Sequence, residues 1–177
     1  LTHTHLSCLL NAMIGNNLEY SDIKEVKVTC FAQAYDILFD PTKYRPESRE
    51  TADHSLPYCM AAAMVDKKIT TESFSDEKLN DPRIYEVIDK IKGEPSQEFE
   101  KMFPAKQPSR VVVTTNDGRI FEEYLEYPKG DPREPMTMDD LKNKFNSLVG
   151  EKLTDVAKNQ LKETIFNSEE MSAGEFM

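Results

Sequence analysis

The segment from Arg49 to Tyr58 brings together side chains that can exchange protons. Asp53, His54 and Ser55 stand shortly before the phenol of Tyr58. We expect a helix to begin near residue 56, which puts Tyr58 in a first turn, where unpaired N–H groups favour bound anions and ionised hydroxyls. The segment therefore predicts a site of proton transfer. The alternative is structural: Asp53 or Ser55 caps the helix and Tyr58 packs its ring.

Histidine is rare in this chain, where it occurs as His3, His5 and His54. An imidazole titrates near neutral pH, so each of them is a candidate proton carrier. For a single histidine, however, a surface position or a hydrogen-bonded core position is the more common explanation.

Cysteine gives no sign of a metal site or a disulfide framework. Cys8, Cys30 and Cys59 are odd in number, form no CxxC pair and have no histidine at a spacing that suits zinc. We therefore expect neither a disulfide framework nor a structural metal site, in a reducing intracellular setting.

A long polar stretch precedes the Asp53–Tyr58 segment, and its prolines and charges predict a structureless loop over residues 40–57. Its cations Lys43, Arg45 and Arg49 could attract an anionic substrate. The favoured alternative is a solvated loop whose charges are offset by neighbouring acids.

Apolar periodicity predicts the elements that must position these residues. Helical spacing predicts helices over residues 4–14, 56–65, 82–91, 139–149 and 155–166, and alternation predicts a strand over 23–31. Asn116-Asp117-Gly118 predicts a turn between strands 110–115 and 119–127. The fold class that follows is α+β, with a small mixed or antiparallel sheet covered by helices on one face. We expect a domain over 1–132 and terminal helices over 133–177, ending in a tail that frays from residue 167.

Composition excludes several classes of function. The 177 residues include 22 Lys and Arg against 32 Asp and Glu, which gives a formal net charge of −10. Such a chain is poorly suited to bind nucleic acid or an anionic membrane. No apolar run approaches the length of a membrane span. The start, Leu1 to His5, has neither Met nor a signal pattern, so we expect that the biological start lies elsewhere.

Three stretches together resemble the MmgE/PrpD family, whose members include 2-methylcitrate dehydratase and cis-aconitate decarboxylase. They are Glu50-Thr-Ala-Asp-His-Ser-Leu-Pro-Tyr58, Asn116-Asp-Gly118 and Tyr127-Pro-Lys-Gly-Asp-Pro132. The first and third are specific, and the resemblance continues to the helix at Lys144-Phe145. It implies that the chain is the C-terminal part of a longer enzyme, without the large helical domain toward which residues 133–177 would pack.

The resemblance also implies roles for individual residues. Tyr58 would line the active site, and a family histidine at the start of the first helix would match His5, or His3 if the register slips. His54 is a second proton carrier. Asp53 and Ser55 are supports. His3, Arg45 and Arg49 are the candidates for binding substrate carboxylates. The lysine that precedes the family histidine would lie before Leu1.

The implied activity is a cofactor-independent lyase that removes a proton next to a carboxylate of a small tricarboxylate, most simply dehydration of 2-methylcitrate in propionate breakdown. The alternatives are decarboxylation of cis-aconitate and epimerisation of an amino-dicarboxylate on the same scaffold. From a different class, the isolated chain could be an inactive dimerisation or docking module. We expect a homodimer in the cytoplasm, or in the mitochondrion of a eukaryote.

Overall fold

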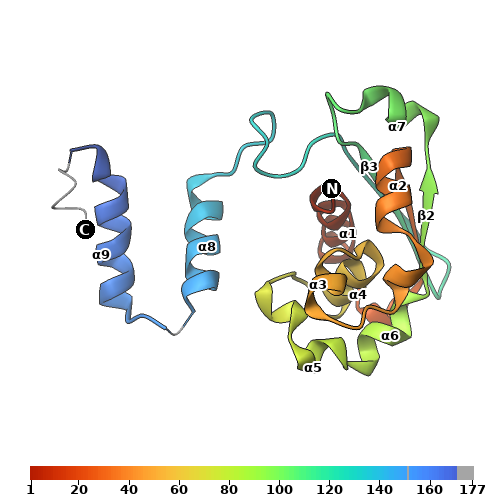
Figure 1. Cartoon of the computed structure of the whole chain (residues 1–177), viewed down its shortest axis with the longest axis horizontal. Coiled ribbons are helices and arrows are strands. Elements are labelled where there is room, and N and C mark those ends of the chain that lie inside the picture. Colours follow the sequence, from red (N-terminus) through yellow and green to blue (C-terminus); the bar gives the residue numbers. More distant parts are fainter. Residues whose placement is uncertain (151, 171–177) are drawn as a thin grey trace. The chain divides into compact units, whose positions relative to one another are not determined.

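A computed structural model describes residues 1–150 and 152–170 of the chain (Figure 1). The chain divides into two compact units, Leu1–Glu134 and Pro135–Met177. The helices of the first unit are α1 (His3–Gly15), α2 (Ala32–Leu38), α3 (Arg49–Asp53), α4 (Leu56–Asp66), α5 (Asp76–Leu79), α6 (Pro82–Ile88) and α7 (Gln97–Met102). Its strands are β1 (Ile23–Cys30), β2 (Ile91–Pro95), β3 (Ser109–Thr115) and β4 (Ile120–Leu125). Short 3-10 turns are η1 (Tyr20–Asp22), η2 (Pro41–Tyr44) and η3 (Thr71–Phe74).

The strands form one mixed sheet in the order β2-β1-β3-β4. β1 pairs in parallel with β2 and antiparallel with β3, and β3 pairs antiparallel with β4. The predicted hairpin is confirmed, and Gly118 takes the positive φ of 88° that its turn requires. This arrangement confirms the α+β class.

The core lies between one face of the sheet and the helices α1 and α4 (Figure 1). Val26 and Val28 of β1 lie beside Val111 and Val113 of β3, and all four are fully buried. The residues that alternate with these buried valines point to the other face of the sheet, where Lys27 and Glu122 are exposed. Helix α7 covers part of this second face, where the ring centres of Phe99 and Tyr124 lie 5.8 Å apart.

The prediction of a structureless loop over residues 40–57 is wrong. Asp40 accepts a hydrogen bond from the Thr42 N–H and starts the turn η2. Ser48 and Thr51 form a reciprocal capping box that starts α3. Local side-chain caps therefore build two short elements that apolar periodicity does not reveal, because each is barely one turn long.

Residues 82–91 are not one helix. α6 ends at Ile88, and Ile91 begins β2, where it pairs with Val26. Ile91 fits the helical period of the preceding residues only by coincidence. Its side chain is buried because it lies in β2. The helices α2 and α7 were not predicted either.

The second unit contains α8 (Met138–Val149), α9 (Asp155–Phe166) and the turn η4 (Ser168–Glu170). Both helices were predicted, and Thr137 and Asp140 form a capping box at the start of α8. The frayed tail expected from residue 167 falls mostly beyond residue 170, outside the described residues. Across the described ranges, no helix combines the length and the apolar character needed to cross a membrane.

Candidate active site

The junction of α3 and α4 is held by Ser55, which caps α4. Its Oγ accepts a hydrogen bond from the Tyr58 N–H at 3.0 Å and donates one to the Lys43 carbonyl at 2.5 Å. Pro57 sits in the first turn, where its missing N–H costs no helical bond. Ser55 thus caps α4 and ties the preceding segment to this helix.

His54 lies at this junction with one ring nitrogen engaged. Its Nδ1 donates to the Glu50 carbonyl at 2.9 Å and contacts the carboxylate of Asp53. The Glu50 carbonyl, followed by Asp53, raises the pKa of His54 above its ordinary value. The side chain is 72% exposed. The arrangement favours the protonated ring and leaves Nε2 as the nitrogen that could exchange a proton.

A pocket of about 280 Å³ opens beside this junction. It is lined by Thr2, His3, Leu6, Asp53, Cys59, Ile69, Thr70 and Phe74. The structure thus brings together His3 from the start of α1 and Asp53 from the end of α3, two residues that the sequence singled out. Apolar side chains with a few convergent polar groups are the usual lining of a small-molecule site.

His5 does not line this pocket. It is buried between α1 and β3, where its Nδ1 lies 2.6 Å from Ser109 Oγ. Burial lowers the pKa of His5 to about 3. The imidazole is therefore neutral near pH 7, and of the two N-terminal histidines it is His3 that reaches a cavity.

Tyr58 is also buried and does not line the pocket itself. Its hydroxyl donates to the Ser73 carbonyl at 2.9 Å, and its ring lies 6.1 Å from that of Phe74, a lining residue. Burial raises the pKa of Tyr58. The sequence placed the phenol near the free N–H groups of its helix, but the side chain reaches across to η3 instead.

The basic residues of the 40–57 segment do not meet in this pocket. Arg45 forms a double hydrogen bond with Asp89, at 3.1 and 2.7 Å, and its guanidinium lies 5.7 Å from the Tyr85 ring centre. Arg49 stands exposed in the first turn of α3. Their role as substrate-binding residues stays a prediction.

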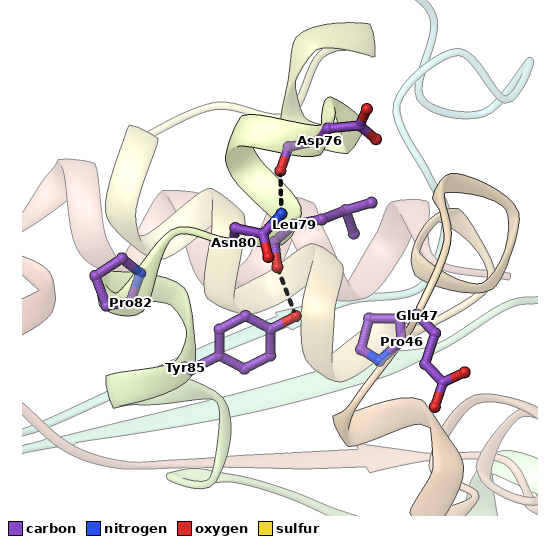
Figure 2. A pocket seen from close by; sticks show the side chains of 7 residues that line it. All are labelled: Pro46, Glu47, Asp76, Leu79, Asn80, Pro82 and Tyr85. Carbon is purple, nitrogen blue, oxygen red and sulfur yellow. Dashed lines mark hydrogen bonds between the residues drawn. The ribbon is translucent and has the colours of Figure 1, made fainter.

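A second, larger hollow of about 580 Å³ lies near Tyr85 (Figure 2). Its lining is Pro46, Glu47, Asp76, Leu79, Asn80, Pro82 and Tyr85. Tyr85 donates its hydroxyl proton to the Leu79 carbonyl, as Figure 2 shows. The described lining residues include carboxylates but no Lys, Arg or His, so this hollow suits a polycarboxylate poorly.

Sequence reasoning missed Thr70, Phe74 and Cys59 as lining residues. Thr70 and Phe74 belong to a segment without a motif or a periodic pattern, and no local signal places it beside α1. Cys59 was considered only among the three cysteines that lack a metal or disulfide pattern. Within residues 1–150 and 152–170, no three His, Cys, Asp or Glu side chains gather where they could hold a metal ion.

Comparison with known proteins finds relatives named cis-aconitate decarboxylase, among them the following three. A cis-aconitate decarboxylase of Mus musculus is 31% identical over 102 residues, 58% of this chain and 21% of the relative. One of Aspergillus terreus is 30% identical over 108 residues, 60% of this chain and 22% of the relative. One of Homo sapiens is 29% identical over 115 residues, 62% of this chain and 22% of the relative. The matches thus span about a fifth of the length of these curated relatives.

The sequence profile of the MmgE/PrpD C-terminal domain matches residues 1–170. This range contains the whole pocket and the α3–α4 junction beside it. The chain therefore belongs to the MmgE/PrpD family, of which it is the C-terminal domain.

Proposed function

We propose that this chain supplies one wall of the active site of a lyase that acts on a small tricarboxylic acid, and that the reaction is decarboxylation of cis-aconitate. The observation that carries the proposal is the pocket that joins His3 to Asp53, whose carboxylate contacts His54. The names of the curated relatives favour decarboxylation over the other reactions that the sequence left open.

The junction fits the proton transfer that this reaction needs. In a decarboxylation the bond between a carbon and its carboxylate breaks, carbon dioxide leaves, and the electron pair left on carbon takes up a proton. His54 would give that proton from Nε2, because the Glu50 carbonyl and Asp53 stabilise its protonated form. Asp53 would repel a substrate carboxylate, so its role is to support His54, while His3 would bind a carboxylate.

Dehydration of 2-methylcitrate is the second candidate, because the Glu50–Tyr58 motif is common to the family and does not separate the two reactions. In that reaction a base takes a proton from a carbon next to a carboxylate, and an acid helps the hydroxyl to leave as water. The same imidazole could serve, since both reactions need one proton carrier beside a bound carboxylate.

The test is to incubate the full-length protein separately with cis-aconitate, 2-methylcitrate and citrate. We expect carbon dioxide release from cis-aconitate, and we expect His54→Gln to lower kcat by roughly 10²–10⁴. Lys101→Gln, at an exposed position of α7, is the matched control and should leave kcat unchanged. Dehydration of 2-methylcitrate alone would select the second candidate, and no turnover of any of the three acids would refute the proposal.

Tyr58→Phe in the same protein tests the role that the resemblance implies for this residue. If the hydroxyl acts only in the transition state, kcat falls by roughly 10²–10⁴ with little change in KM. A kcat/KM within about threefold of wild type would instead assign Tyr58 to packing behind the pocket, through its bond to Ser73.

A further inference from the structure

One wall of the pocket is a segment whose apolar side chains are only partly buried. Residues 69–74, here called the wall segment, contribute Ile69, Thr70 and Phe74 to the lining. The chain enters this segment after Lys67, which ends α4 with a left-handed φ of 56°. Between residues 65 and 80, the buried residue is Ser73. Ile69 and Phe74 pack against the core but stay partly exposed, so polar contacts also contribute to the position of this segment.

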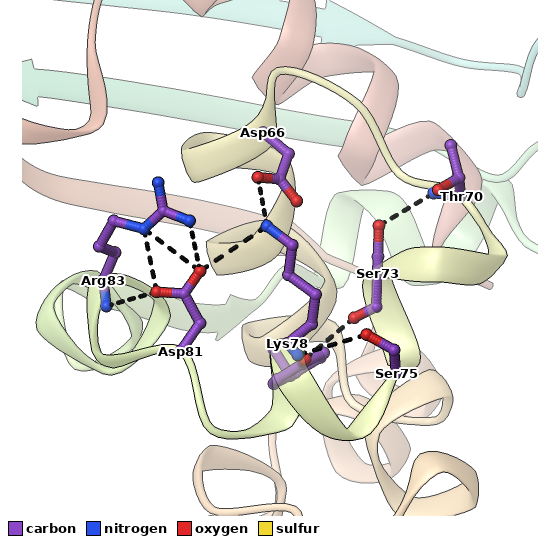
Figure 3. A network of polar contacts seen from close by, with 8 residues as sticks. Asp66, Thr70, Ser73, Ser75, Lys78, Asp81 and Arg83 are labelled. Atoms are coloured by element: carbon purple, nitrogen blue, oxygen red, sulfur yellow. Dashed lines mark hydrogen bonds and ion pairs between the residues drawn. The ribbon is translucent and has the colours of Figure 1, made fainter.

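These polar contacts form a connected network around the wall segment (Figure 3). Ser73 accepts at its carbonyl from Tyr58 and at its Oγ from the Thr70 N–H, at 2.9 and 3.0 Å. Ser75 caps α5 by accepting from the Lys78 N–H at 3.3 Å. The wall segment is thereby linked to the helix that carries Lys78.

Lys78 connects that helix to two helices of the core. Its Nζ lies 2.6 Å from Asp66 Oδ1, at the end of α4, and 3.7 Å from Asp81 Oδ2, at the start of α6. The side chains of Lys78, Asp66 and Asp81 are 21%, 18% and 9% exposed, so solvent screens these charges only in part.

The two acids differ in what they would keep without Lys78. Asp81 also binds Arg83, which is 2.6 Å away, and caps α6. Among the described residues, Lys78 is the cation that pairs with Asp66. Loss of Lys78 would therefore leave Asp66 without its partner. It would also remove the contact that holds α5 against the end of α4.

We propose that Lys78 is a positioning residue that holds the wall segment of the pocket against α4 and α6, and so sets the affinity of the site for its substrate. The inference rests on the proposed function only in assigning the pocket to substrate binding. Lys78 contacts neither the pocket nor a reacting group. It acts through Ser75, Ser73 and Thr70 on the shape of the cavity.

Steady-state kinetics and hydrogen exchange of the full-length protein test this proposal with Lys78→Met. We expect KM to rise about tenfold with kcat within about twofold of wild type, because binding and not chemistry is weakened. Amide exchange in residues 67–80 should accelerate at least about tenfold, while β1 and β3 stay protected. Lys78→Arg, which keeps the charge, should return KM and amide exchange in residues 67–80 most of the way to their wild-type values.

Lys106→Met is the matched control, since Lys106 lies 2.6 Å from Glu126 in another partly exposed ion pair of the same unit. It should change neither KM nor exchange in residues 67–80. Unchanged KM and exchange in Lys78→Met would overturn the inference, as would an equal effect of the control. If Lys78→Met does not fold, Asp66→Asn carries the same test with the same expected and refuting results.

The exchange experiment separates this inference from the proposed function. If the wild-type protein turns over none of the three acids, the proposed function fails. Accelerated exchange confined to residues 67–80 would still support Lys78 as the anchor of the wall segment, and unchanged exchange would still refute it.

Discussion

At the scale of single residues, burial decides what identical side chains can do. His5 and His54 carry the same imidazole, but the pKa of His5 is lowered to about 3 by burial and that of His54 is raised by the Glu50 carbonyl and Asp53. A buried ring without a counter-charge loses its proton, whereas an exposed ring beside acceptors keeps it. His54 is therefore the better proton carrier of the two.

The lowered pKa of His5 predicts a pH dependence of stability. The unfolded value is 6.5 and the folded value about 3, so between these limits the unfolded chain binds one more proton than the folded chain. The contribution of His5 to the free energy of unfolding should therefore be fully present above pH 6.5. It should fall as the pH drops from 6.5 toward 3, by up to about 1.4 kcal/mol per pH unit.

Urea unfolding of the wild-type chain and of His5→Gln, at several pH values from 7.5 to about 4.5, measures this contribution. Glutamine can still hydrogen-bond to Ser109 but does not titrate. We expect the difference in unfolding free energy between the two proteins to change with pH in the direction given above. Parallel pH profiles would show that His5 takes up its proton in the folded state.

At the scale of elements, short capped pieces position the candidate site. The caps at Asp40, Ser48 and Ser55 start η2, α3 and α4 in succession, and the last of them orients the junction that holds His54. Each cap satisfies N–H groups that no helical bond could satisfy. The segment before Tyr58 is thus a chain of small ordered elements.

Gly93 of β2 shows how tightly these elements meet. A Cβ added there would lie 2.5 to 2.8 Å from three ring atoms of Phe39, a residue that is 6% exposed. Gly93→Ala should therefore destabilise the chain by about 1–3 kcal/mol, because either the ring or the strand must move. Chemical unfolding measures the loss.

Gly15→Ala is the control for this substitution, since nothing lies within 4 Å of the Cβ it would add at the end of α1. We expect its effect to lie within about 0.5 kcal/mol of zero or to be mildly stabilising. An equal loss in both variants would mean that contact with Phe39 is not the cause.

At the scale of the whole molecule, the second unit presents apolar side chains to solvent. Leu141, Leu148, Leu161, Ile165 and Phe166 are between 42% and 56% exposed. Between α8 and α9 lies a cleft of about 230 Å³ lined by Leu141, Phe145 and Ile165, among others. The family resemblance implies that these helices pack toward a helical domain, and in the chain alone we expect a second copy to cover them.

Analytical ultracentrifugation of the 177-residue chain at high micromolar concentration tests this expectation. The chain should sediment as a two-fold dimer, and Leu141→Glu should sediment as a monomer because it places a charge in the apolar cleft. Asn143→Glu, at an exposed polar position of the same helix, should remain dimeric. A wild-type chain that is strictly monomeric would contradict the prediction, and the homodimer would then depend on parts outside this chain.

Much of the fold could be predicted because its signals are local. The helical periods of α1, α4, α8 and α9, the alternation of β1 and the turn at Asn116-Asp117-Gly118 each depend on residues within a few positions of one another. The MmgE/PrpD family could be predicted for the same reason, since Glu50–Tyr58 and Tyr127–Pro132 are contiguous motifs.

Only the tertiary structure decided which candidate residues share a site. Ser109 faces His5 from more than a hundred positions away, His3 meets Asp53 and Thr70 across a pocket, and Tyr58 bonds to Ser73 of a segment without a motif. The pairing of β2 with β1 is likewise a contact between distant residues. Burial, pKa and pocket membership depend on such contacts, and no local period records them because the same apolar or polar pattern fits several packings.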